Sequence, residues 1–361
     1  MRANFRRGYA RLRVLAAPFL ILLFISACAT VPPAPGTASA TPGAQSGPTT
    51  PANATKAPSG PTAVPTLTGE HTLSLATSGT DESYYGYGKA LSTLWSGSLS
   101  NVRVVPSTAG ASVAALRSIG ANQVDMALAQ SDIADYAYNG TQMFGDKIGN
   151  LRSVAVLFPQ LVQWVMDPDI IYTIQGIKGA QIAVGPAGSG SEANTREILD
   201  ANGIAYKDLV KALFLTSNEA VAAFNTGQIH GFCLTDAISS PAVVEATNTR
   251  KIRMLPITGS EAQNVMSRYK RLAPATIPAG SYKGVSEAVP TLGVRAILVV
   301  RQGLDDSLVY WLTRTLMEKQ AELAQANPLG KELAKSVVQG DLPVPLHPGA
   351  ERYYRETGTL K

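Results

Sequence analysis

The sequence is poor in cysteine, histidine and charge, and these shortages exclude several classes of protein. Its 361 residues include two cysteines and three histidines, and only 16% are charged. Two cysteines cannot build a disulfide framework. The histidines, His71, His230 and His347, are scattered, and no G-x-S-x-G segment occurs, so a nucleophile with a neighbouring base is not evident. We therefore predict that the protein is not an enzyme.

Motifs for metals and nucleotides are also missing. The chain has no H-E-x-x-H, no paired-cysteine spacing and no G-x-x-x-x-G-K-[ST], so we expect neither a metal nor a cofactor. Its net charge of +5 comes from five arginines among residues 1–27, which contain no acidic residue. The rest of the chain has 26 basic and 26 acidic residues, which argues against nucleic acid as a partner.

The first residues have the order of an export signal. An arginine-bearing stretch is followed by the apolar run Val14 to Ile25 and then by Ser26-Ala27-Cys28. The run is short for a membrane span. Its ending resembles a bacterial lipoprotein processing site, which predicts a signal peptide over 1–27 and lipid on Cys28. An ordinary cleaved signal and an uncleaved anchor are the alternatives. With lipid on Cys28, we expect an extracytoplasmic, membrane-anchored protein, in the periplasm or on the outer face of the cytoplasmic membrane.

Residues 28–66 have the composition of a tether. Positions 29–66 contain nine Pro, nine Ala and eight Thr, and Lys56 is the only charged residue. Such a segment buries too little apolar surface to offset the entropy of ordering, so we predict that it is disordered. Proline keeps it extended, which would hold a folded domain away from the lipid.

From Leu67 onward, apolar β-branched runs alternate with amphipathic ones, which predicts an α/β protein with helices on both faces of mainly parallel sheets. Hydrophobic residues make up 45% of the chain, enough for a large core. Expected strands are 72–76, 102–106, 125–129, 153–158, 181–184, 229–234, 252–257 and 291–300. Expected helices are 84–95, 112–119, 131–138, 192–201, 218–224, 241–247 and a long one over 305–326, with Leu308, Val309, Leu312 and Leu316 on one face.

Four of the predicted strands run into small polar loops that open directly into helices. These loops are 77–80, 107–112, 130–132 and 188–191. Small hydroxyl residues cap helix starts, glycine admits a ligand to the backbone, and the unpaired N–H groups favour an anion. Ligands of open α/β sheets bind at the carboxyl ends of strands, where all four loops lie. Each loop alone is also explained as a capped turn, but together they predict a ligand cleft.

These loops resemble those of the TAXI family, the substrate-binding receptors of TRAP-type secondary transporters. The resemblance covers nearly all of residues 72–358. It rests on six segments in the family's order: A-T-S-G-T-D-E-S-Y-Y at Ala76, S-T-A-G-A-S at Ser107, A-L-A-Q-S-D at Ala127, V-G-P-A-G-S-G-S at Val184, T-I-P-A-G-S-Y at Thr276 and P-L-H-P-G-A-E-R-Y-Y at Pro345.

The resemblance implies a two-lobed, periplasmic-binding-protein-like fold (type II-like) with the ligand cleft between the lobes. Lobe 1 would comprise 67–170 and 291–361, and lobe 2 would comprise 171–290. The implied solute is a small organic anion or amino acid, of the glutamate-like or dicarboxylate class, and the partner is a separate TRAP-type membrane permease. Carried over by position, the implied ligand contacts are Thr77, Ser78, Tyr84, Tyr85, Ser107, Thr108, Ser112, Gln130, Ser131, Asp132, Gly188, Ser189, Gly190 and Ser191.

Several positions leave alternatives open. Asp132 would either receive an amino group or only favour its own helix. Asp81 and Glu82 replace small residues of the family's first loop: facing solvent they are neutral to binding, and lining the cleft they favour a zwitterion or cation. His230-Gly231 also departs from the family and is expected in a surface turn. Cys233, in an apolar run, is expected to be a buried structural thiol.

Three outputs are compatible with such a cleft. The protein would deliver its solute to a permease, present it as a lipid-anchored sensor to a membrane signalling protein, or serve as a surface scaffold that no longer binds a solute. The intact cleft hydroxyls argue against the scaffold. For a binding cleft we expect hinge closure of the lobes over the ligand.

Overall fold

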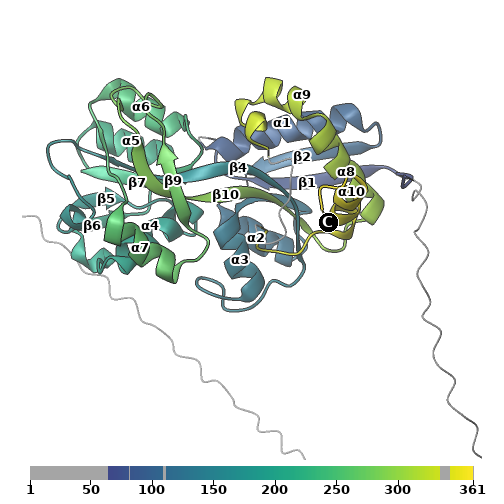
Figure 1. Ribbon diagram of the computed structural model, residues 1–361, viewed down its shortest axis with the longest axis horizontal. Coiled ribbons are helices and arrows are strands. Elements are labelled where there is room, and N and C mark those ends of the chain that lie inside the picture. Colours follow the sequence, from purple (N-terminus) through teal and green to yellow (C-terminus); the bar gives the residue numbers. More distant parts are fainter. Residues whose placement is uncertain (1–63, 81, 109–110, 334–341, 361) are drawn as a thin grey trace, which may run out of the picture. The chain divides into compact units, whose positions relative to one another are not determined.

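Two long strands form the middle of a single sheet in the computed structural model, which describes residues 64–80, 82–108, 111–333 and 342–360. These strands are β4 (Leu151–Met166) and β10 (Val289–Arg301), and they run antiparallel side by side from one half of the sheet into the other (Figure 1). The order along the sheet is β2-β1-β3-β10-β4-β7-β5-β6, with β8 paired to β4 and β9 paired to β10.

Parallel strands flank this central pair on each side. On one side lie β1 (His71–Thr77), β2 (Val102–Thr108) and β3 (Met126–Gln130); on the other lie β5 (Gln181–Ala183), β6 (Lys211–Leu213) and β7 (Gly231–Asp236). The two short additions are β8 (Arg253–Met254) and β9 (Ala273–Ile277). The expectation of mainly parallel sheets is wrong for the sheet as a whole: five of its nine described pairings are antiparallel, because β4 and β10 run against all their neighbours.

Helices cover both faces of the sheet in each half. The half with β1 to β3 carries α1 (Ser83–Ser98), α2 (Ser112–Gly120), α3 (Ser131–Asn139), α8 (Asp306–Glu318), α9 (Gln320–Ala326) and α10 (Pro348–Glu356). The other half carries α4 (Gly190–Ala201), α5 (Ser217–Asn225), α6 (Pro241–Thr249) and α7 (Gly259–Arg268). Short 3-10 turns lie at Gln175–Ile177, Tyr206–Asp208 and Pro328–Glu332.

Four apolar cores hold these layers together, two in each half. In the first half, α1, α8 and α10 pack over one face around Trp95 and Phe158, and α2 and α3 pack over the other around Leu116. In the second half, α4 and α7 cover one face and α5 and α6 the other, with Trp164 and Phe232 buried in their respective cores. A large apolar side chain contributes about 1.5–3 kcal/mol when fully buried. The predicted two-lobed α/β fold, with a cleft between its lobes, is therefore confirmed.

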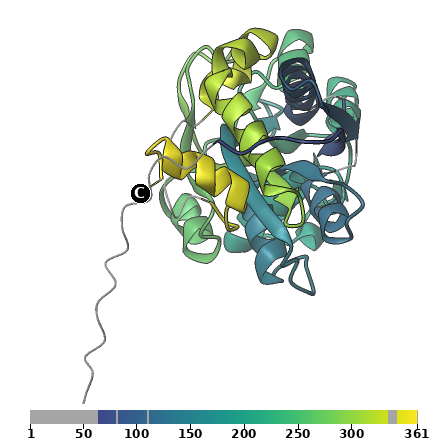
Figure 2. The ribbon, with the colours of Figure 1, turned by 90° about the vertical axis from the view of Figure 1, so that its right-hand side faces the viewer.

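The long helix expected over 305–326 is interrupted. Its apolar stripe is confirmed, since Leu308, Val309, Leu312 and Leu316 are all buried, and Asp305 caps the start by accepting from the Leu308 N–H at 2.9 Å. The chain leaves the helix at Lys319 and resumes as α9. Figure 2 shows α8 beside α10, the final helix of the same half.

The predicted signal peptide, Cys28 and nearly all of the predicted tether lie outside the described residues. Within the described part, none of the helices combines the length and the apolar character that crossing a membrane requires.

Candidate functional site

The starts of four helices converge on one pocket between the halves of the sheet. Strand β1 is parallel to both of its neighbours, β2 and β3, so the helices that follow these three strands begin at the same edge of the sheet. Helix α4 begins at this edge from the other half of the sheet. The pocket is lined by Ser78, Glu82, Tyr84, Ala111, Ser112, Gln130, Gln160, Ser189, Gly190, Ser191, Thr235 and Asp236. Its free volume of about 20 Å³ is room for about one water molecule.

Serine side chains fix the backbone around the pocket. Ser189 Oγ caps α4 by accepting from the Glu192 N–H at 3.0 Å. Ser112 Oγ accepts from the Gln130 N–H at 3.3 Å and joins the start of α2 to the end of β3. Ser191 Oγ accepts from the Thr235 N–H at 3.0 Å and joins α4 to β7. In these bonds the serines act as acceptors, so each hydroxyl still has a proton that it can donate.

The two halves touch inside the pocket at Gly190 and Gln130. A Cβ on Gly190 would overlap the side-chain carboxamide of Gln130, so a larger residue at the start of α4 would require the Gln130 side chain to move. The halves are also joined by Asp135 on α3, whose carboxylate pairs with Arg271 at 2.9 Å.

The ionisable groups that line the pocket are acidic or phenolic. Asp236 ends β7 and is 5% exposed, and Glu82 precedes α1 and is partly buried. Burial raises the pKa of Asp236, while hydrogen bonds from Ser83, Ala237 and Ser240 oppose that shift. Among the described lining residues there is no lysine, arginine, histidine or cysteine. The described lining therefore offers no nucleophile paired with a histidine base.

A tyrosine and two glutamine amides complete the walls. The buried Tyr84 hydroxyl donates to Gln160 Oε1 on β4 at 2.6 Å. Burial raises the pKa of Tyr84, as do the charges of Asp132, Asp236 and Glu82. Gln130 Oε1 and Thr235 Oγ1 are buried and have no hydrogen-bond partner among the described residues. Both atoms can accept a hydrogen bond from a ligand.

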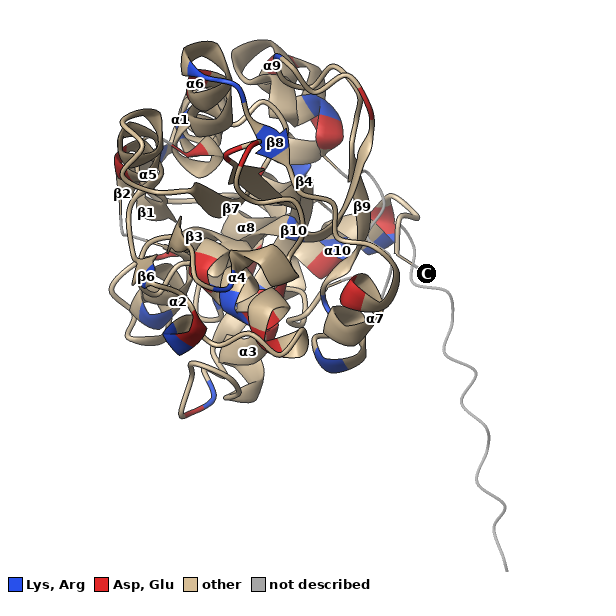
Figure 3. Ribbon diagram, turned by 90° about the vertical axis from the view of Figure 1, so that its left-hand side faces the viewer, with Lys and Arg blue, Asp and Glu red and all other residues tan. Residues whose placement is uncertain are grey.

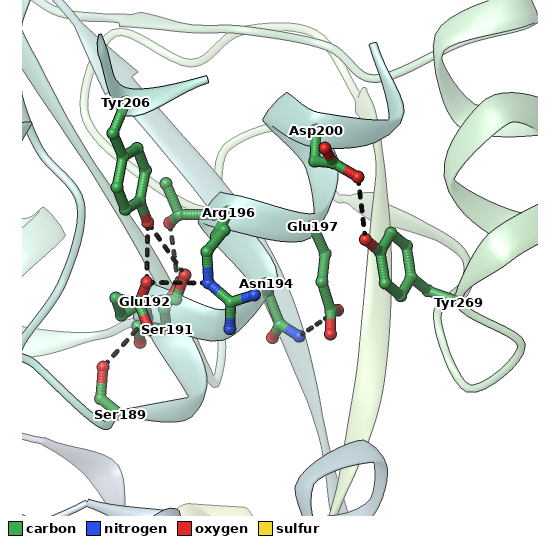
Figure 4. A network of polar contacts seen from close by, with 10 residues as sticks. Ser189, Ser191, Glu192, Asn194, Arg196, Glu197, Asp200, Tyr206 and Tyr269 are labelled. Carbon is green, nitrogen blue, oxygen red and sulfur yellow. Dashed lines mark hydrogen bonds and ion pairs between the residues drawn. The ribbon is translucent and has the colours of Figure 1, made fainter. Parts of the chain in front are cut away.

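A second polar cluster lies behind the pocket, where α3 meets α4. Asp132, Asn194 and Glu197 are fully buried, and the Asn194 amide donates to Asp132 Oδ2 at 2.5 Å and to Glu197 Oε2 at 3.5 Å. Figure 4 shows Asn194 and Glu197 side by side below α4, on a different face from Glu192 and Arg196. Burial is the main cause that raises the pKa of Asp132 and of Glu197, and their mutual repulsion adds to it for Glu197.

Half of the sequence-predicted contacts line the pocket. They are Ser78, Tyr84, Ser112, Gln130, Ser189, Gly190 and Ser191. The other seven do not line it. Thr77 is buried and donates to the Ser107 carbonyl, Ser131 is buried and accepts from the Arg295 N–H, and Asp132 belongs to the second polar cluster. Tyr85 is partly buried beside Lys89, and the remaining three are exposed: Ser107, Thr108 and Gly188.

The predicted set omits five lining residues: Glu82, Ala111, Gln160, Thr235 and Asp236. Thr235 and Asp236 end strand β7, which the sequence pattern placed two residues too early, at 229–234. A polar pair directly after an apolar run is the signal that would have found them. Of the two acids left open, Glu82 lines the pocket and Asp81 lies outside the described residues.

The remaining single-residue expectations have clear outcomes. Cys233 is a buried free thiol, as expected, and burial raises its pKa to about 12. His230 lies in a bend before β7 and is partly buried, while Gly231 opens the strand itself. His347 is fully buried and caps α10, its Nδ1 accepting from the Gly349 N–H at 3.2 Å, which is a structural role.

Figure 3 shows basic and acidic residues interspersed on α4 and α7 rather than separated into faces of one sign. One such pair is Arg268 with Asp200, at 3.1 Å. No group of three or more histidine, cysteine or acidic side chains within the described ranges is placed to hold a metal ion.

The fold and the interlobe pocket together define a two-lobed protein of the periplasmic-binding-protein type. The chain belongs to the NMT1-like family, whose profile matches residues 75–358. A protein of Bordetella bronchiseptica RB50 is similar in structure, with a TM-score of 0.50 at 14% identity over 80% of this chain and 98% of that one.

Two further solved structures are similar. PhnD1 from Prochlorococcus marinus, in complex with methylphosphonate, has a TM-score of 0.50 at 12% identity over 80% of this chain and 99% of its own. The periplasmic aliphatic sulphonate binding protein SsuA from Escherichia coli has a TM-score of 0.43 at 15% identity, covering 81% and 94% of the two chains.

Proposed function

We propose that the protein is an extracytoplasmic solute-binding receptor that captures a small organic anion or amino acid between its lobes and releases it unchanged. The observation that supports this most directly is the pocket itself, which both lobes line with helix starts, hydroxyls and amides. Several hydrogen bonds to a charged group contribute roughly 1.5–3 kcal/mol each, enough for micromolar binding at about 8 kcal/mol after association costs are deducted.

The contacts we propose are the seven predicted residues that line the pocket, together with Gln160, Thr235 and Asp236. Mass spectrometry of small molecules released from purified, denatured protein tests the binding function directly. A stoichiometric organic solute is expected. Protein that carries no solute and binds none from a metabolite library would contradict the proposal.

We propose that lobe 1 comprises residues 67–170 and 291–361, that lobe 2 comprises residues 171–290, and that the hinge lies at β4 and β10. Both strands cross between the halves, and β10 has two register irregularities against β4, at Arg295/Ile297 and Leu298/Val299, which provide places to bend. The ligand would bind one lobe and the helix starts of the other would close over it. Small-angle X-ray scattering should show a smaller radius of gyration in saturating ligand; an unchanged radius would argue against closure.

We further propose that the receptor delivers its solute to a TRAP-type secondary transporter, on the strength of the six TAXI-like segments. Uptake of the radiolabelled solute by cells that express the receptor with the permease encoded beside it is the test. Uptake that requires both chains is expected. Unchanged uptake without the receptor, together with solute-dependent activation of a neighbouring sensor kinase, would instead assign it to signalling.

Membrane attachment through lipid on Cys28 is the last part of the proposal. The full-length protein should partition into the detergent phase of Triton X-114, and its Cys28→Ser variant should move to the aqueous phase or retain its signal peptide. Equal partitioning of both proteins after removal of the signal peptide from both would contradict lipidation.

A further inference from the structure

The start of α1 is capped by an acid from the other lobe. Glu82, the residue before α1, makes no side-chain capping bond to the helix. Asp236, at the end of β7 in lobe 2, accepts hydrogen bonds from the backbone N–H and from the side chain of Ser83, the first residue of α1. A carboxylate at a helix start is favourable, because it satisfies unpaired N–H groups and interacts with the positive end of the helix dipole.

Other bonds fix Asp236 at this position. Its carboxylate also accepts from the Ala237 N–H at 2.8 Å and from the Ser240 side chain. Its backbone carbonyl accepts from Gln163 Nε2 at 3.1 Å, and the Tyr282 hydroxyl donates to Gln163 Oε1 at 2.7 Å. Tyr282, the last residue of the T-I-P-A-G-S-Y segment, therefore acts on the pocket through Asp236.

The anion position at the start of α1 is thus occupied when the lobes are closed. Asp236 is 5% exposed and lines the pocket together with Tyr84 of α1. The free volume of about 20 Å³ leaves no room for a second carboxylate beside it. A solute carboxylate bound at α1 would displace Asp236, and the displaced charge would be buried without its donors from Ser83, which is costly. Closure over the solute therefore requires that the start of α1 is left to Asp236.

Serines line the pocket at the starts of α2 and α4. The Ser112 and Ser191 hydroxyls accept backbone N–H groups at 3.3 and 3.0 Å and keep a proton that they can donate. Two buried acceptors that line the same pocket, Gln130 Oε1 and Thr235 Oγ1, have no hydrogen-bond partner in the described part of the chain. One solute carboxylate suits these helix starts, and one hydroxyl or amino group suits the two acceptors.

We infer that Asp236 determines the specificity of the pocket: it occupies the anion position at the start of α1, so that the closed lobes accept a solute with one carboxylate and a hydroxyl or amino donor and reject a dicarboxylate. This inference rests on the proposed receptor function and narrows its ligand class. Specificity of this kind comes from a group that excludes the wrong solute. Because Asp236 and Ser83 belong to opposite lobes, the same contact also helps to hold the lobes together.

Isothermal titration calorimetry of the full-length protein, refolded after its solute has been removed, tests the inference with matched pairs of solutes. In each pair an amide replaces the second carboxylate with little change in shape: L-glutamine with L-glutamate, L-asparagine with L-aspartate, and the 4-amide of L-malate with L-malate. The first two pairs carry an amino donor and the third carries a hydroxyl. The parent should bind at least one amide about tenfold or more tightly than the matching diacid, because the diacid sets like charges side by side.

Asp236→Ala removes the carboxylate from the start of α1 and should reverse this preference. The diacid should gain about tenfold in affinity over the parent, because its second carboxylate accepts the bonds that Asp236 accepted. The amide should lose affinity together with the cap between the lobes, whereas a variant that only damaged the fold would weaken both solutes alike.

Two further variants complete the test. Asp236→Asn keeps the volume of the side chain, so the diacid should gain less than in Asp236→Ala. The control is Glu322→Gln, which removes an exposed acid on α9 that pairs with Lys319, and it should bind as the parent does.

The outcomes separate the specificity of the pocket from the receptor function. A parent that binds the diacids as tightly as the amides overturns the inference and leaves the receptor intact. Diacid affinity that does not rise in Asp236→Ala, or that rises equally in Asp236→Asn, also overturns it. If no probe binds to parent and Asp236→Ala proteins with native circular dichroism spectra, the inference is overturned, and the solute released from purified protein decides whether the receptor function stands.

Discussion

Asn194 Nδ2 lies 2.5 Å from Asp132 Oδ2 and thereby joins α4 of one lobe to α3 of the other through a buried amide–carboxyl contact. Glu197, one turn further along α4, is 3.5 Å from the same nitrogen. The Asn194 side-chain oxygen has no hydrogen-bond partner among the described residues. Because two carboxyl groups share this buried contact between the lobes, their protonation changes the charge that the contact buries.

Stability should fall as pH rises above about 4. Burial raises the pKa of both Asp132 and Glu197, so the folded protein keeps protons that the unfolded chain loses above the ordinary carboxyl pKa of about 4. The folded state then binds more protons, and the free energy of unfolding decreases with pH, by up to about 1.4 kcal/mol per unit of pKa difference. The contribution is complete below about pH 4 and is lost toward the raised values.

Thermal melts between pH 4 and pH 9 measure this slope, and Asp132→Asn with Glu197→Gln should flatten it. The cluster also faces Asp135, Tyr136 and Arg196. These three residues are present in both the parent and the double variant, so their own contributions to the pH slope cancel in the comparison. Glu322→Gln, on the surface of α9, should keep the parental slope. Equal slopes in the parent and the double variant would show that the pair does not cause the effect.

Gly190→Ala should weaken both the closed lobes and ligand binding. Its Cβ would overlap the buried Gln130 carboxamide, and moving the end of this flexible side chain costs about 1 kcal/mol, the lower end of the range for overpacking. Gln130→Ser in the same chain removes the obstructing atoms and should restore most of the lost stability. The control is Gly97→Ala near the end of α1, where an added Cβ meets nothing within 4 Å. A double variant no more stable than Gly190→Ala alone would exclude this steric cause.

The sequence predicts the local parts of this site better than the parts that meet across the sheet. Each of Ser78, Ser112, Gln130 and Ser189 follows a strand and precedes a helix, a pattern visible within ten residues of chain. Gln160 and Asp236 reach the pocket only because β4 pairs with β10 and β7, and that pairing joins residues far apart in sequence.

The strand boundaries failed for a related reason. The predicted strand 153–158 ends before Pro159, which has no N–H for a ladder, yet β4 continues to Met166. Pro159 is tolerated because it lies opposite Arg295, next to a register irregularity where the regular ladder is already interrupted. The three-residue β6 and the exposed β9 lack the apolar pattern that predicts strands. They form because they pair with the neighbouring strands β5 and β10, respectively.

Tyr84→Phe should destabilise the protein and lower its affinity for the solute. The Tyr84 hydroxyl donates to Gln160 Oε1 at 2.6 Å inside the pocket, and its loss leaves a buried acceptor without that donor, at a cost of about 1–3 kcal/mol. Chemical denaturation measures the stability and calorimetry the affinity. Tyr172→Phe is the matched control, since that ring is 54% exposed and keeps its contact with Arg253. Equal losses in both variants would contradict a specific role for the Tyr84–Gln160 bond.

Cys233 should resist alkylation until the protein unfolds. Its thiol is buried on β7, and burial raises its pKa to about 12, so the reactive thiolate is scarce at neutral pH. Peptide-level mass spectrometry after iodoacetamide treatment should find Cys233 unlabelled in native protein and fully labelled in guanidinium chloride. Its labelling rate at intermediate denaturant should follow the fraction unfolded measured by circular dichroism. Rapid labelling under native conditions would contradict this prediction. It would mean that lobe 2 opens locally around β7, the strand that ends at Asp236 and is bonded to Ser191, without global unfolding.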